Sequence, residues 1–256
     1  MAAMGEPRNP RVLLVPGVTG SKEDFSLMLP DLAEAGFYVL SYDLAGQYQS
    51  AGAGPENLAP ARKHYDYALF VDDLLAILEA GEGPVHVVGY SFAAIVAQIA
   101  FARRPDLFQS LTLLSCPPQP GQSFRGVEKY GRFSGWANGR LGAALMIWGI
   151  RLNLNKVTPN RLRFVRQRFR FTRRESVRDI YDLMKQAPDL RGVLAAAALP
   201  KFVAVGEHDL WPLALHQRFA ESIGARIQVY RGGHSPSETS PREFARDLLA
   251  LFGQAR

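Results

Sequence analysis

The chain of 256 residues is long enough for one large domain, and its composition, 47% hydrophobic and 21% charged, is typical of a globular protein. Its single cysteine excludes an internal disulfide framework and a cysteine-based metal cluster. The formal net charge of +6 is unevenly distributed, because residues 118–192 contain 16 basic and only 5 acidic residues. No nucleic-acid fold accompanies this charge, so we expect no nucleic-acid partner.

The sequence predicts neither a leader nor a membrane anchor. The first seven residues contain no apolar stretch of the kind found in secretory signals. The longest apolar run, residues 141–150, contains two glycines and is too short to cross a bilayer. We therefore expect a cytoplasmic protein without a transmembrane segment, present as a monomer or a homodimer.

Apolar strands alternate with amphipathic helices, the pattern of a parallel sheet covered on both faces. Helices are expected from Ser21, over residues 67–78, after Ser91, and from Ser240, where Ser-Pro-Arg-Glu predicts a capping box. The class is therefore α/β, with a mostly parallel sheet of about six strands. The strands are expected at residues 11–15, 38–42, 85–89, 110–114, 202–205 and 226–230.

The alternation stops between residue 117 and about residue 194. This stretch has helical patterns, no convincing strand and its own charge balance. Helices inserted between two sheet strands are typical of a lid over one edge of a core. We expect a core of residues 1–116 and 193–256, and a helical lid at 117–192 inserted before the last two strands.

The most informative stretch is residues 85–94, which read Val-His-Val-Val-Gly-Tyr-Ser-Phe-Ala-Ala. A strand pattern passes directly into a helical pattern, so the chain reverses through a tight turn between Gly89 and Ala93. Ser91 lies at the tip of this turn, in the strand–turn–helix context of a nucleophile elbow. Taken alone, the pentapeptide also fits a serine that only caps a helix.

A serine nucleophile needs a base, usually a histidine that a carboxylate orients. His234 directly follows the last strand, at the sheet edge where sites of parallel sheets assemble. Asp209 follows the preceding strand, and its alternative role is that of a solvated residue capping the next helix. The order serine, acid, histidine is expected with such an elbow. The other histidines are expected to be structural (His64, His86 and His216) or a bystander (His208).

An acyl transfer also requires donors for the developing oxyanion. The backbone N–H of Phe92, at the start of the helix, is one candidate. The N–H of Val18, in the glycine-rich loop after the first strand, is the other. The alternative for this loop is a simple strand-to-helix turn.

These motifs resemble those of the α/β-hydrolase superfamily, in its lidded, cofactor-free type. The matching segments are residues 13–17, residues 42–50, the elbow, and Gly233-His234 with the terminal helix. Pro16 replaces the histidine of the usual His-Gly pair, and Tyr48 stands where the family has a second glycine. The family normally begins with an extra hairpin, for which ten residues leave little room, so we expect six strands without it.

The resemblance implies a serine hydrolase without a cofactor or metal. Ser91 would attack, His234 would take the proton, and the same histidine would activate water against an acyl-enzyme. The expected substrate is a small-molecule carboxylic ester or thioester with a small or medium acyl group. The alternatives are a C–C bond hydrolase, lactonase or perhydrolase of the same fold, and a non-catalytic ligand-binding protein that retains the triad.

Five residues are candidate substrate contacts. Met146 and Trp148 fit either an acyl pocket or packing within the lid itself. Arg166 and Arg168 belong to a run of arginines and aromatics at 161–171. That run fits a solvated helix face, a platform for an anionic substrate, or contact with an anionic membrane. Trp211, beside the candidate acid, is the fifth.

Overall fold

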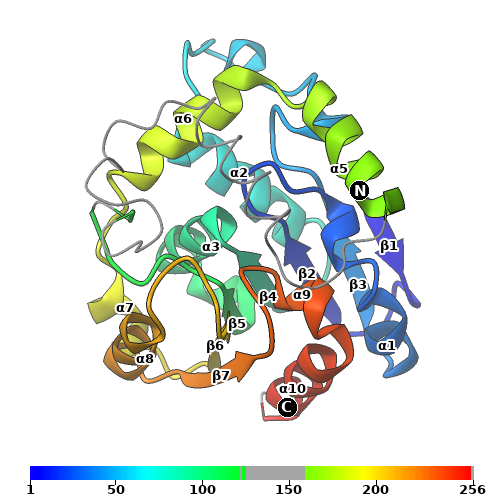
Figure 1. Cartoon of the computed structure of the whole chain (residues 1–256), viewed down its shortest axis with the longest axis vertical. Helices are drawn as coiled ribbons and strands as arrows, with labels where there is room; N and C mark the ends of the chain where they lie inside the picture. Colours follow the sequence, from blue (N-terminus) through cyan, green and yellow to red (C-terminus); the bar gives the residue numbers. More distant parts are fainter. Residues whose placement is uncertain (122, 125–158, 255–256) are drawn as a thin grey trace.

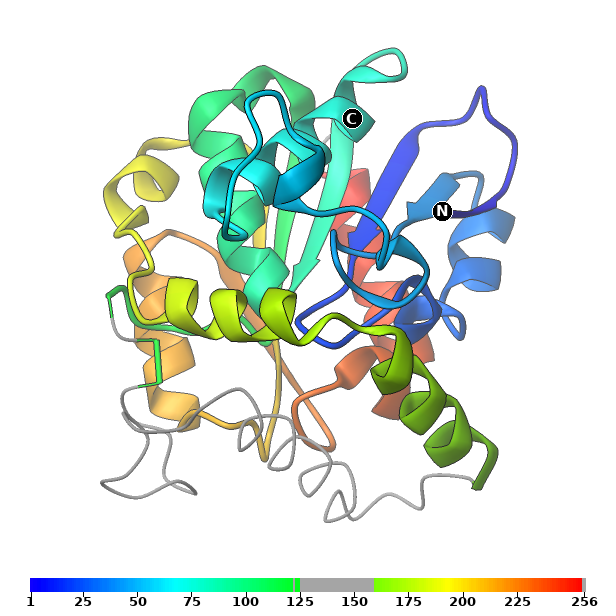
Figure 2. The same cartoon turned by 90° about the horizontal axis from the view of Figure 1, so that it is seen from above.

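The computed structural model describes residues 1–121, 123–124 and 159–254, which form one sheet with helices on both faces (Figures 1 and 2). Within these residues the sheet has seven strands in the order β1-β3-β2-β4-β5-β6-β7. Strands β2 to β7 pair in parallel, so the predicted α/β class is confirmed. The strands are β1 (Ala2–Met4), β2 (Arg11–Val15), β3 (Tyr38–Ser41), β4 (Val85–Tyr90), β5 (Phe108–Leu114), β6 (Lys201–Gly206) and β7 (Arg226–Tyr230).

Strand β1 corrects the expected count of six. It pairs antiparallel with β3, Ala3 lying opposite Leu40, and covers an edge whose backbone groups would otherwise lack partners. Gly5 follows at a φ of 95°, and a Cβ there would lie 2.2 Å from the carbonyl oxygen of Phe37. Three residues give no hydrophobic period, which explains why the sequence pattern misses this strand.

Helices cover both faces because successive side chains of each strand point to opposite sides. In β2, Leu13 and Val15 join one buried cluster, whereas Val12 and Leu14 join the other. The first cluster is covered by α2 (Tyr67–Glu79), α3 (Phe92–Arg103), α7 (Arg191–Ala196) and α8 (Leu213–Ser222). The second is covered by α1 (Leu29–Glu34) and α10 (Pro241–Gly253).

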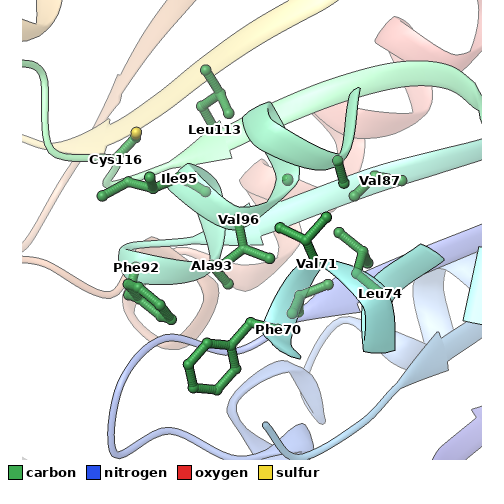
Figure 3. Packing of buried hydrophobic residues seen from close by; sticks show 14 of the residues in the cluster. Phe70, Val71, Leu74, Val87, Phe92, Ala93, Ile95, Val96, Leu113 and Cys116 are labelled. Carbon is green, nitrogen blue, oxygen red and sulfur yellow. The ribbon is translucent and has the colours of Figure 1, made fainter. Parts of the chain in front are cut away.

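Helix α3 lies in the middle of the first cluster, between α2 and the sheet (Figure 3). Ala93 and Val96 of α3 are completely buried, as are Val71 of α2 and Val87 of β4. Small side chains on α3 permit this close packing of helix on sheet. The packing fixes the start of α3, which follows Ser91.

The region between β5 and β6 contains α5 (Pro159–Phe171) and α6 (Arg174–Met184) among its described residues. Met146 and Trp148, two of the candidate substrate contacts, lie outside the described residues. The division into core and lid stays a prediction. Its second boundary falls within α7, whose Leu194 is buried in the first cluster.

Arg11 caps the end of α2 from the neighbouring strand. Its Nη2 donates to the carbonyl oxygens of Leu78, Gly81 and Gly83 at 2.8, 3.1 and 2.9 Å, and the residue is buried. The last carbonyls of a helix have no partner within the helix, and a cation is favourable there. Arg11 therefore joins the sheet to the helix that packs on α3.

We expect Arg11→Met to lower the free energy of unfolding by about 2–3 kcal/mol, because buried carbonyls lose a charged donor. Urea denaturation measures this change. The control is Arg103→Met, which removes an exposed ion pair with Asp72 at 3.0 Å and should cost under about 1 kcal/mol. Equal losses in the two variants would contradict the capping role.

Candidate active site

Ser91 occupies a sharp turn between β4 and α3. Its φ of 54° and ψ of −116° are unfavourable for a residue with a side chain and mark local strain. The Ser91 N–H donates to the carbonyl of Leu114 in β5 at 2.8 Å. At Gly89 a Cβ would lie 2.6 Å from the carbonyl oxygen of Ala93, so only glycine permits this approach. The predicted tight turn is confirmed.

The structure brings Ser91, His234 and Asp209 into one hydrogen-bonded chain. The Ser91 Oγ lies 3.1 Å from His234 Nε2, and His234 Nδ1 lies 3.1 Å from Asp209 Oδ2. With the ring proton on Nδ1, His234 donates to the carboxylate and accepts from the serine hydroxyl. Each residue follows the carboxyl end of a parallel strand, β4, β6 or β7, which is why they meet.

Asp209 is held as a carboxylate. Burial alone would raise its pKa, but the imidazoles of His234 and His216 outweigh burial and hold the pKa of Asp209 well below its usual range. Asp209 Oδ1 also accepts the backbone N–H of Trp211 at 3.3 Å and lies 3.6 Å from His216 Nε2. The predicted structural histidine His216, completely buried, thus lies against the candidate acid.

The loop that carries His234 is closely packed against its neighbours. The Gly232 carbonyl accepts the His208 N–H at 2.9 Å. The Tyr90 hydroxyl lies 2.8 Å from Ser235 Oγ, and its ring centroid lies 5.4 Å from that of His234. Tyr90, the residue before Ser91, therefore binds Ser235, the residue after His234. Sequence reasoning missed this role, because nothing in a tyrosine beside the elbow indicates a partner 145 residues away.

Ser240 also holds this loop, which corrects the predicted capping box. Its Oγ donates to the carbonyl of Arg231 at 3.2 Å and makes no capping bond with α10. An N-cap serine accepts an N–H of the first helical turn, and here the hydroxyl is turned to the Arg231 carbonyl and accepts none. The start of α10 is nevertheless where the sequence predicts it.

Gly206, at the end of β6, lies directly under the histidine loop. A Cβ at this position would be 1.9 Å from the carbonyl oxygen of Gly233 and 2.8 Å from that of Gly232. No side chain fits this space unless the backbone moves. The position of His234 therefore depends on glycine at position 206.

We expect Gly206→Ala to lower the free energy of unfolding by about 1–3 kcal/mol, because the added methyl group displaces the loop. The measurement is urea denaturation. Gly192→Ala is the matched control, since a Cβ there meets nothing within 4 Å and alanine favours its helix. Unchanged stability in Gly206→Ala would show that the loop moves freely.

The two candidate oxyanion donors belong to segments next to Ser91. Phe92 is the first residue of α3, whose leading N–H groups have no partner within the helix. Val18 lies in a turn closed by the Gly20 N–H and the Gly17 carbonyl at 2.9 Å. A Cβ on Gly17 would be 3.1 Å from Ser91 Cβ, so this turn packs against the serine.

The family follows from comparison with known sequences. A model of the alpha/beta hydrolase family matches residues 12–247. The chain belongs to the alpha/beta hydrolase family. The predicted family and the predicted hydrolase class are therefore confirmed.

Relatives of this alpha/beta hydrolase include several esterases. The strigolactone esterase RMS3 of Pisum sativum is 25% identical over 241 residues, which are 85% of this chain and 84% of that protein. A hydrolase from Pseudomonas aeruginosa PA01 has a TM-score of 0.79 at 23% identity, covering 98% and 93% of the two chains. A thermophilic esterase from Thermogutta terrifontis has a TM-score of 0.78 at 22% identity, covering 99% and 92%. The two solved structures establish the shared fold.

The remaining substrate candidates of this hydrolase lie in different environments. Trp211 is buried, with its ring centroid 5.9 Å from that of His234, and its Nε1 donates to the Ser123 carbonyl at 2.6 Å. Arg166 is exposed on α5. Arg168 is buried, and its Nη1 contacts Asp24 and lies 3.2 Å from Ser21 Oγ.

Arg168 is paired with a carboxylate of the protein itself, because the buried Asp24 lies against its guanidinium. Its role as a substrate contact, like that of Arg166 and Trp211, stays a prediction. Arg161 lies seven residues earlier on the same face of α5 and also contacts Asp24, at 2.7 Å. It forms a second ion pair with Glu238 of the short helix α9 (Pro236–Thr239). These contacts hold α5 against the segments that follow Val18 and His234.

The structure supplies no evidence for a metal or a membrane span within the residues it describes. Their histidine, cysteine and carboxylate side chains form no group of three that could hold a metal ion. In the same part of the chain, no helix is long and apolar enough to cross a bilayer. The predicted cellular location and oligomeric state stay predictions.

Proposed function

We propose that this alpha/beta hydrolase is a serine esterase or thioesterase acting on small or medium acyl groups. The observation that carries the proposal is the chain of two 3.1 Å contacts from Ser91 through His234 to the buried Asp209. The first of these contacts is made by Ser91, whose backbone is held in a left-handed conformation at the start of α3. The esterases among the relatives support the same reaction class.

In the first half of the reaction, Ser91 Oγ attacks the carbonyl carbon while His234 Nε2 takes the hydroxyl proton. The imidazolium that forms is stabilised by the ionised Asp209 at Nδ1. The oxyanion is received by the N–H groups of Val18 and Phe92. Collapse of the tetrahedral intermediate transfers the proton from Nε2 to the leaving alcohol or thiol, which leaves Ser91 acylated.

In the second half, water replaces the leaving group. His234 Nε2 takes a proton from this water as it attacks the acyl carbon, and the same two N–H groups receive the oxyanion. Collapse returns the proton to Ser91 Oγ and releases the acid. The segment 117–192 would act as the lid that selects the acyl group.

We expect Ser91→Ala to abolish labelling by a fluorophosphonate probe and to lower kcat for p-nitrophenyl acetate by at least about a thousandfold, because the nucleophile is lost. Gel fluorescence and initial rates measure the two effects. Ser115→Ala is a matched control, since Ser115 is buried at the end of the neighbouring β5 with a φ of 44°. It should label and react like the wild type.

A wild-type protein that neither labels nor hydrolyses esters would contradict the proposal. That result would favour the alternative of a ligand-binding protein that retains the three residues. With an active protein, a series of p-nitrophenyl esters of increasing acyl length would locate the preferred group.

The pKa of Asp209, held below its usual range, predicts the pH dependence. A carboxyl group with a lowered pKa stays ionised as the pH falls through the ordinary carboxyl range, so Asp209 adds no proton to the acid limb of the rate profile. We expect the acid limb of log kcat/KM against pH to have a slope of about one. Circular dichroism at each pH confines the fit to folded protein. A slope of about two would show that Asp209 is also titrating.

A further inference from the structure

Gln47 is a completely buried glutamine in the loop between β3 and the short 3-10 helix η2 (Tyr48–Ser50). Its Oε1 accepts the backbone N–H of Thr19 at 2.6 Å, across 28 residues of sequence. Thr19 directly follows Val18, the proposed oxyanion donor. The bond thus fixes the peptide plane on one side of that donor.

The backbone at Thr19 needs such support. Thr19 has a φ of 59°, a left-handed conformation that is unfavourable for a β-branched residue. Residues held in this way persist only where surrounding contacts impose the conformation. The buried bond from Thr19 to Gln47 is a contact of this kind.

The backbone just before Gln47 is held by the start of α6 and by Arg173, the residue before that helix. The Gly46 carbonyl accepts the Arg173 N–H at 2.8 Å, and the Ala45 carbonyl accepts the Ser176 Oγ–H at 3.0 Å. The Gln47 carbonyl accepts the Ser50 N–H at 2.8 Å within its own loop. A side chain mounted on backbone held at these points can hold another loop in place.

The orientation of the Gln47 amide follows from chemistry. The Thr19 N–H requires an oxygen, so Oε1 faces Thr19 and Nε2 faces away. Nε2 is buried and has no hydrogen-bond partner among the described residues. An unpartnered buried donor destabilises a fold, and such groups in native structures call for an explanation other than stability.

We propose that Gln47 is a positioning residue, which holds the Thr19 peptide so that the Val18 N–H is directed at the oxyanion beside Ser91. This inference rests on the proposed serine hydrolase function. Gln47 touches neither the substrate nor Ser91 in this role. It acts through the backbone of the Val18 turn, on the transition state rather than on the ground state.

The test compares Gln47→Met with Gln49→Met in the full-length chain. Methionine has similar length and cannot accept the Thr19 N–H as an amide oxygen does. Gln49 lies two residues further on, in η2, but its Oε1 accepts Lys22 Nζ at 2.8 Å and not the Thr19 N–H. We expect Q47M to lower kcat for p-nitrophenyl acetate by about ten- to a hundredfold, with KM changed less than about twofold.

A boronic acid supplies the readout that a general structural defect would not give. Because its tetrahedral adduct with Ser91 mimics the oxyanion, Q47M should weaken inhibition by a phenylboronic acid by the same factor as kcat. The acid limb of the pH profile should not move, since His234 and Asp209 are untouched. Q49M should match the wild type in kcat and in boronic acid affinity.

Equal kcat and boronic acid affinity in Q47M and wild type would overturn the inference, as would a rise in KM alone. If Q47M does not fold, Gln47→Asn keeps a polar amide, withdraws it by one methylene group, and is judged by the same measurements. A wild type without labelling or hydrolysis would overturn the proposed function itself. An active wild type with an unaffected Gln47 variant would overturn only the role of Gln47.

Discussion

The close approach of β4 to α3 is the constraint on which the site depends. A Cβ at Gly89 would lie 2.6 Å from the Ala93 carbonyl, so strand and helix almost touch where the chain turns. Ser91 must bridge this short gap and takes a left-handed φ as a consequence. Burial of α3 between α2 and the sheet holds the geometry in place (Figure 3). The packing of α3 against the sheet thus contributes to the backbone strain at Ser91.

The parallel sheet then determines which other residues meet Ser91. Loops that leave the carboxyl ends of β6 and β7 start on the same edge, but their tips have many conformations open to them. Close packing restricts this freedom: Gly206 admits the Gly233 carbonyl, and Tyr90 joins the elbow to Ser235. The 3.1 Å contacts of His234 are therefore imposed by neighbours that take no part in the proposed chemistry.

The sequence predicts the six parallel strands and the trio of Ser91, Asp209 and His234, because both depend on local signals. Apolar runs mark the strands, and the residues at their ends mark the site. Contacts between distant segments have no such signal. Ser240 binds the Arg231 carbonyl instead of capping α10, and Gln47 reaches Thr19. In each case the polar side chain bonds a backbone group that is distant in the sequence and comes near only in the folded chain.

The arginines of residues 161–171 form one pattern in the sequence, but the fold gives them two different environments. Arg161 and Arg168 are seven residues apart, on one face of α5, and both contact the buried Asp24. Arg163, Arg166 and Arg170 lie on the exposed face of the same helix. Composition alone treats all five as one positive patch. The buried pair instead fastens α5 to the segment after Val18 and, through Arg161 and Glu238, to the segment after His234. Helix α5 therefore contacts a segment beyond each of two site loops, the one that contains Val18 and the one that contains His234.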